Sequence, residues 1–292
     1  MKKVTIFLAL CTLFLYSIPQ ESQTCTTFCL DDGGQPVCGK NYDWMVEDGL
    51  VIINKRGVKK TAIPAAQQTL SPLKWTSKYG SVTFNQYGRE LPMGGMNEAG
   101  LVVEAMLLDE TEYPLPDSRP ALLSWQWGQY QLDNFSTVEE VIASKSQIRI
   151  MASVGPGTHF LVCDKTGNSA TIEFLAGNLV YHTKKTMPVK TLTNSIYSES
   201  INFWKKDKLP PFDNYRSVER FIRAATMVKN YDSETSIKAN VSYSFDILKS
   251  TSQMNTQLSI VYDVEKYCIY FRTAGNPKIR HIDTKRQYFS TS

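Results

Sequence analysis

The chain has 292 residues, of which 42% are hydrophobic and 21% are charged, and its formal net charge is +4. This length allows one large domain with a substantial core. The charge is too small to favour a nucleic acid or a membrane surface as a partner. Because no group of cysteine and histidine residues has metal-site spacing, we expect neither a metal nor another cofactor.

The N-terminal segment predicts a secretory signal peptide. Two lysines precede an almost wholly apolar run at residues 4–18, which is too short to span a membrane comfortably, and a polar stretch follows up to Thr24. We therefore expect residues 1–24 to be removed and the protein to be exported, to the periplasm or the exterior, with no stable membrane insertion. The alternatives are an upstream cut followed by self-cleavage, lipid modification of Cys25, and an uncleaved anchor.

The first third of the chain predicts mainly strands. Asp31-Asp32-Gly33-Gly34 indicates a hairpin between the first two of them, and Gly94 to Gly100 indicates a turn. The expected strands cover residues 25–30, 36–42, 50–54, 81–87 and 101–108.

The rest of the chain alternates between helices and strands. A capping box at Ser136-Thr137-Val138-Glu139 predicts a helix that ends near residue 144. Other helices are expected at residues 121–132, 215–229 and 236–249, and strands at 159–164, 169–175, 189–193, 258–264, 267–272 and 278–283. With no repeat or linker, residues 25–292 are expected to form a single domain of sheets with helices packed outside them.

Cys25 is the leading candidate for chemistry. If the chain is cut before it, one residue carries both a thiol, with an ordinary pKa of about 8.5, and an α-amine, with a pKa of about 7.7–8.0. The amine can then accept the thiol proton, so nucleophile and base need no histidine. Asp43 lies on the returning hairpin strand, where antiparallel pairing can bring its carboxylate close to that amine. The alternative is an ordinary buried cysteine in a strand.

The other four cysteines after residue 24 are predicted to be ordinary buried residues, namely Cys29, Cys38, Cys163 and Cys268. Four residues of extended chain separate Cys25 from Cys29 by roughly 13 Å, so these two cannot pair. His159 starts an apolar strand and offers an alternative, a papain-like Cys–His pair, although a structural histidine is the better interpretation.

Four segments together resemble the choloylglycine hydrolase and penicillin V acylase family of N-terminal-nucleophile amide hydrolases. They are Cys25-Thr26, Gly39-Lys40-Asn41-Tyr42-Asp43-Trp44, Gly95-Met96-Asn97-Glu98-Ala99-Gly100-Leu101 and Leu192-Thr193-Asn194-Ser195. The resemblance implies an α+β fold, a four-layer α/β/β/α sandwich. It also implies Cys25 as nucleophile with its amine as base, Asp43 holding that amine, Asn194 donating to the oxyanion, and Arg220 supporting the site electrostatically.

Two positions depart from the family pattern. Lys40 stands where arginine is usual, which keeps the charge but loses the planar fork, and we predict that it is a working substitute. Leu107 stands where several bile-salt members have an oxyanion asparagine, so a second donor has to come from elsewhere.

The resemblance implies a hydrolase of linear amide rather than peptide bonds. Its substrate would be a small N-acyl amide such as a conjugated bile salt, penicillin V or an acyl-homoserine lactone. Two alternatives are a papain-like thiol hydrolase using His159 and a secreted binding protein that keeps the fold without turnover. Homo-oligomer formation stays open.

Overall fold

The computed structural model describes residues 24–30, 35–64, 72–153, 155–210, 215–232, 240–286 and 289–290. The predicted signal peptide therefore lies outside the described residues except for Thr24, as does the predicted hairpin tip at residues 31–34. Within the part of the chain that is described, no helix is both long enough and apolar enough to cross a membrane.

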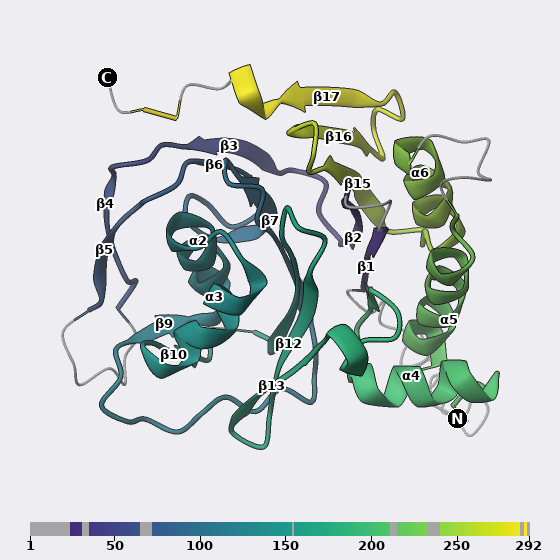
Figure 1. Ribbon diagram of the computed structural model, residues 1–292, viewed down its shortest axis with the longest axis horizontal. Coiled ribbons are helices and arrows are strands. Elements are labelled where there is room, and N and C mark those ends of the chain that lie inside the picture. Colours follow the sequence, from purple (N-terminus) through teal and green to yellow (C-terminus); the bar gives the residue numbers. More distant parts are fainter. Residues whose placement is uncertain are drawn as a thin grey trace, which may run out of the picture.

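Two antiparallel sheets stack face to face and form the middle of the molecule (Figure 1). The first sheet has the strand order β14-β1-β2-β15-β16-β17, with every neighbouring pair antiparallel. Its strands are β14 (Thr191–Leu192), β1 (Cys25–Leu30), β2 (Val37–Asp43), β15 (Thr256–Asp263), β16 (Cys268–Thr273) and β17 (Arg280–Asp283).

The second sheet has the order β13-β12-β11-β8-β7-β6-β3. Its strands are β13 (Asn178–Thr183), β12 (Ser169–Leu175), β11 (Thr158–Cys163), β8 (Val102–Leu107), β7 (Pro92–Asn97), β6 (Ser81–Asn85) and β3 (Leu50–Asn54). Two short pairs flank it, namely β4 (Lys59–Thr61) with β5 (Lys74–Thr76) and β9 (Ala121–Leu123) with β10 (Arg149–Met151).

Helices cover the outer face of each sheet. On the second sheet, α2 (Ser124–Asn134) packs on β7 and β8, followed by α3 (Val138–Ala143). On the first sheet, α5 (Tyr215–Lys229) packs on β1 and α6 (Asn240–Ser250) packs on β2, while α4 (Tyr197–Lys206) lies against α5 (Figure 1). The predicted four-layer α/β/β/α sandwich is therefore confirmed.

Strands β1 and β2 are buried along their whole length, because a helix layer covers one face of the sheet and the second sheet covers the other. Alternation in β1 sends Cys25, Thr27 and Cys29 to one face and Thr26 and Phe28 to the other. Cys25 and Cys29 belong to the core between the sheets, whereas Phe28 packs with residues of α5 and α6.

Most predicted strands and helices occur within two residues of their expected bounds. Of the helix expected at residues 236–249, the first four positions lie outside the described residues, and α6 is described from Asn240. The predicted capping box occurs one residue later, with Thr137 and Glu140.

Two further assignments are wrong. Gly94 and Gly95 lie inside β7 rather than in a turn, and the turn itself covers only residues 98–100. Both positions need glycine because a Cβ at Gly94 would come within 2.1 Å of the Glu104 carboxylate, and one at Gly95 within 2.5 Å of the Val82 carbonyl oxygen. The helix predicted at residues 121–132 instead begins at Ser124, after β9.

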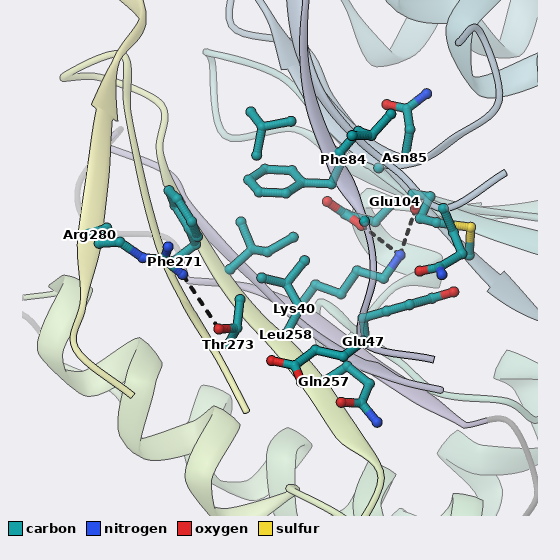
Figure 2. Close-up of a pocket in the computed structure, with 18 residues that line it drawn as sticks. Lys40, Glu47, Phe84, Asn85, Glu104, Gln257, Leu258, Phe271, Thr273 and Arg280 are labelled. Carbon is teal, nitrogen blue, oxygen red and sulfur yellow. Dashed lines mark hydrogen bonds and ion pairs between the residues drawn. The ribbon is translucent and has the colours of Figure 1, made fainter. Parts of the chain in front are cut away.

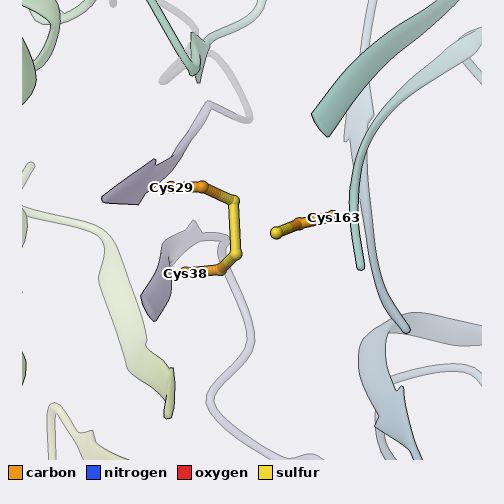
Figure 3. Close-up of side chains that lie close together, drawn as sticks. All are labelled: Cys29, Cys38 and Cys163. Atoms are coloured by element: carbon orange, nitrogen blue, oxygen red, sulfur yellow. A yellow bond between two sulfur atoms is a disulfide. The ribbon is translucent and has the colours of Figure 1, made fainter. Parts of the chain in front are cut away.

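The prediction that Cys29 and Cys38 are ordinary buried thiols is also wrong, because they form a disulfide. They are direct cross-strand partners in β1 and β2, so their side chains leave the sheet on the same face (Figure 3). Cys163 is buried and not part of this disulfide, and its sulfur lies within 4.8 Å of both. Cys268, by contrast, is only partly buried.

Candidate active site

Cys25 begins β1 and is 3% exposed. It pairs with Tyr42 across the β1–β2 ladder, so both side chains lie on the face that meets the second sheet. Its backbone nitrogen donates a 2.6 Å hydrogen bond to Oδ1 of Asn194. The thiol is therefore buried at one end of the central strand, with its own nitrogen already directed at a polar side chain.

Asn194 and Arg220 meet at this strand end from two other parts of the chain. Asn194 follows β14, and its Nδ2 donates to the backbone carbonyl of Leu107 at 2.8 Å. Arg220 comes from α5 and is fully buried, and its Nη2 donates to Oδ1 of Asn194 at 3.0 Å and to the Cys25 carbonyl at 3.4 Å. Its Nε donates to Thr26 Oγ1 at 3.2 Å. The guanidinium thus fixes both the strand end and the asparagine amide.

Asp43 ends β2 on the other side of Cys25 and is fully buried. Its Oδ1 accepts a 2.6 Å hydrogen bond from Thr256, and its Oδ2 accepts one of 3.2 Å from the hydroxyl of Thr24. Its backbone N–H donates to the Thr24 carbonyl at 3.0 Å. Burial raises the pKa of this carboxyl to about 6, and the Thr256 bond opposes that shift. One carboxylate oxygen is therefore occupied by the residue directly before Cys25.

Lys40 lies in β2, two residues before Tyr42. Its side chain is on the same face of the sheet as that of Cys25, because its cross-strand partner is Thr27. Its ammonium is 2.8 Å from the Glu104 carboxylate (Figure 2). It also donates to the carbonyls of Met93 and Ala105 at 2.6 Å each. An ammonium has three hydrogens, and these three acceptors account for them. Lys40 therefore joins the two sheets, and its hydrogens are used by groups other than Cys25.

Burial dominates the ionisation of the Cys25 thiol and raises its pKa to about 11. The nearby charge of Lys40 opposes that effect most strongly, and the backbone N–H of Asp43 and the charge of Arg220 also oppose it. The negative charge of Asp43 reinforces it. With Thr24 attached, the thiol is accordingly held in its neutral form.

The structure does not bring His159 into this group. His159 lies in β11, fully buried, and its Nδ1 is 3.3 Å from Oε1 of Glu173. The same oxygen accepts a 2.9 Å hydrogen bond from the backbone N–H of Tyr197, the first residue of α4. The pair therefore anchors the start of the helix that follows the Asn194 loop, a structural position rather than a catalytic one.

Sequence reasoning did not identify Thr24, Thr256 or Glu104 as neighbours of the site. Thr24 looked like the end of a disposable leader, and Thr256 begins a strand more than 200 positions from Asp43. Glu104 carries a weak signal, because it is a carboxylate inside an apolar strand and so needs a buried partner.

Comparison with known proteins agrees with this geometry. Residues 25–207 match the family described as linear amide C–N hydrolases, choloylglycine hydrolase family. The chain belongs to this family. The match begins at Cys25 and includes Asp43 and Asn194.

Individual relatives point the same way. A penicillin V acylase of Pectobacterium atrosepticum is 28% identical over an alignment of 326 positions, which covers 96% of this chain and 82% of that protein. The structure of penicillin V acylase from Agrobacterium tumefaciens superposes with a TM-score of 0.76 at 27% identity, covering 91% and 88% of the two chains. A mutant of the conjugated bile acid hydrolase of Clostridium perfringens shares the fold, with a TM-score of 0.73 at 20% identity over 91% and 94%. The chain therefore has the N-terminal-nucleophile hydrolase fold and belongs to a family of enzymes that act on linear amide bonds.

Proposed function

We propose that this protein is an exported amidase that uses Cys25 as an N-terminal nucleophile on a small N-acyl amide. The observation that carries the proposal is the convergence of Asn194, Arg220 and Asp43 on the backbone at Cys25. Once residues 1–24 are removed, the Cys25 nitrogen becomes an α-amine next to its own thiol. That amine would remain beside Asn194, and Oδ2 of Asp43 would lose Thr24 as its partner and become available to it.

The reaction follows from these positions. The α-amine takes the thiol proton, and the thiolate attacks the carbonyl carbon of the amide, giving a tetrahedral oxyanion. Collapse breaks the C–N bond, and the leaving amine takes the proton from the α-ammonium, which leaves a thioester on Cys25. Water, deprotonated by the same amine, then hydrolyses the thioester and releases the carboxylic acid.

Asn194 would donate to the oxyanion, and this role is supported by its second amide hydrogen, which Leu107 does not use. Replacement by alanine is expected to lower kcat by about 10²–10³-fold, as the loss of one oxyanion donor does. Asn194→Asp keeps the acceptor for the Cys25 nitrogen and for Arg220 but removes the donor, so it should lose a similar factor. Steady-state kinetics of both variants test this, and rates within threefold of the parent would remove Asn194 from the role.

Lys40 is expected to lower the thiol pKa by its charge. Lys40→Met alone would leave Glu104 charged and unpaired in the core, which costs about 3–5 kcal/mol, so the informative variant combines Lys40→Met with Glu104→Gln. Its thiol should be alkylated only at higher pH than the parent's, and Lys40→Arg should resemble the parent. Glu104→Gln alone retains the lysine and serves as the control. An unchanged alkylation profile in the double variant would show that Lys40 does not act on Cys25.

Export is supported by two features. Residues 1–24 have the layout of a signal peptide, and the Cys29–Cys38 disulfide suits an oxidising compartment. The relatives named above favour penicillin V or conjugated bile salts as substrate types, within a wider class of N-acyl amides. Purified protein beginning at Cys25 should hydrolyse members of an N-acyl amide panel and form a thioester adduct visible by intact mass. A folded protein that hydrolyses none of them would instead favour the binding-protein alternative.

A further inference from the structure

A cavity of ≈ 250 Å³ lies between the two sheets. We call it the inter-sheet slot, and its walls include Tyr42, Ile260 and Leu258 of the first sheet and Val51, Phe84 and Glu104 of the second. Figure 2 shows the rings of Phe84 and Phe271, one from each sheet, next to each other, and their centroids are 5.7 Å apart. The Lys40–Glu104 pair lies at the inner end of the slot. The slot does not include Cys25 itself, so its relation to the thiol has to come from the strand register.

The register connects the slot to Cys25 in a straight line across the first sheet. Cys25 pairs with Tyr42, Tyr42 with Leu258, and Leu258 with Thr273. The last three all line the slot. Since adjacent strands are about 4.8 Å apart, the slot begins one strand away from the thiol and runs perpendicular to the strands. A second row of cross-strand partners, two residues away from the first on each of these strands, forms the rest of this wall. Its members are Lys40, Ile260, Phe271 and Arg280.

A matching row on the second sheet forms the opposite wall. Glu104 pairs with Gly94, Gly94 with Phe84, and Phe84 with Val51, and all four line the slot. Gly94 is what leaves room for the Glu104 carboxylate in this wall. The buried Lys40–Glu104 pair lines the inner end, whereas Leu50 and Val51 at the outer end are 60% and 44% exposed. The slot therefore runs from a charged end, one strand away from the nucleophile, to an open end at the surface.

We infer that the inter-sheet slot binds the acyl group of the substrate and that its occupant is an unbranched aliphatic chain. This inference rests on the proposed amidase function. Polar and charged residues are among those that line the slot, but the surface that faces it is mainly apolar. Stacked sheets are only about 10 Å apart, so the occupant is thin and apolar. The volume is below the roughly 300–1,000 Å³ typical of pockets for drug-sized molecules, which fits a chain better than a polycyclic body.

The geometry also fixes the direction of the chain. With the amide carbonyl at Cys25, the acyl chain crosses the Tyr42 strand and runs outward between Leu258 and Phe84 towards Val51. The Tyr42 hydroxyl, which is buried and has no hydrogen-bond partner among the described residues, lies where the chain enters. Because the outer end is open, chains longer than the slot emerge into solvent. Longer substrates should therefore still bind, but their additional methylenes should not raise kcat/KM further.

A homologous series of amides of one amine, from acetyl to tetradecanoyl, tests this length dependence. For the parent, kcat/KM should rise about three- to fourfold per added methylene, the factor expected for burying one CH₂, and then level off. Leu258→Trp fills the slot near its inner end and should abolish this rise, so that kcat/KM falls far more for the long-chain amides than for the acetyl amide. Val51→Trp narrows the outer end and should reduce kcat/KM only for the longest substrates.

Ile53→Trp is the matched control, since Ile53 lies on the same strand as Val51, is 42% exposed and does not line the slot. Its length profile should equal the parent's. An unchanged profile in both Leu258→Trp and Val51→Trp, or an equal loss for the acetyl and long-chain amides, would overturn the inference. A phenylacetyl amide that is faster than every aliphatic member would do the same.

A binding measurement separates this inference from the proposed function. In protein beginning at residue 25 with Cys25→Ala, the affinity for fatty acids should increase with chain length in calorimetry, and Leu258→Trp should remove that increase. If no amide is hydrolysed by the parent but this binding pattern is found, the slot stands and the amidase proposal fails. If amides are hydrolysed with no length dependence and fatty acids do not bind, the amidase proposal stands and the slot inference fails.

Discussion

Replacement of Cys25 by alanine is expected to abolish amide hydrolysis while the protein still folds. The sulfur of Cys25 is the attacking atom in the proposed reaction. Loss of a nucleophile that works as a unit with its base commonly costs a factor of about 10⁴ or more in kcat. Cys25→Ser should lose nearly as much, because a hydroxyl ionises far less readily than a thiol. Single-turnover assays on purified variants, with melting curves to confirm folding, measure both effects.

His159→Ala supplies the contrast. His159 is fully buried against Glu173, and that carboxylate also holds the start of α4. Truncation should therefore lower the melting temperature and leave kcat within a few-fold of the parent. If a well-folded His159→Ala protein is inactive while Cys25→Ala retains turnover, the papain-like alternative is correct and the N-terminal mechanism is wrong.

Sequence patterns could predict the part of the site that depends on pairing between strands adjacent in the chain. A hairpin signal between two strand patterns is enough to bring Asp43 back beside Cys25, and the observed register does so through Thr24. The helix at Tyr215–Lys229 also has the predicted bounds, because its apolar spacing is long and regular. The assignment of Arg220 to the site came only from family resemblance, and its bond to Asn194 was not predicted, since the two lie 26 positions apart in separate elements.

The features that were missed depend on contacts between elements. Gly94 and Gly95 have the composition of a turn, but they are strand residues because a carboxylate and a neighbouring backbone occupy the space of their missing side chains. The Cys29–Cys38 disulfide depends on a one-residue choice of register, which composition does not specify. The Lys40–Glu104 pair joins strands of different sheets. No local pattern contains that information.

Retention of Thr24 is expected to block both catalysis and ionisation of the thiol. In the longer chain the Cys25 nitrogen is a peptide nitrogen, which cannot accept a proton, and Thr24 occupies Oδ2 of Asp43. The thiol pKa is then about 11, mainly because of burial. At pH 8 such a thiol is ionised to roughly one part in a thousand. Removal of Thr24 places an ammonium beside the thiol, and a neighbouring positive charge lowers its pKa.

Two proteins that differ by one residue test this, one beginning at Thr24 and the other at Cys25. Both carry a free α-amine, but only the second carries it on the nucleophile. The Cys25 protein should be alkylated at a much lower pH and should turn over amides, whereas the Thr24 protein should be alkylated only near pH 11 and should be at least about 10³-fold slower, as expected for a missing base and a protonated thiol. Intact mass before and after each assay excludes trimming of Thr24 during the measurement. Equal rates from a protein that still carries Thr24 would show that the α-amine of Cys25 is not the base.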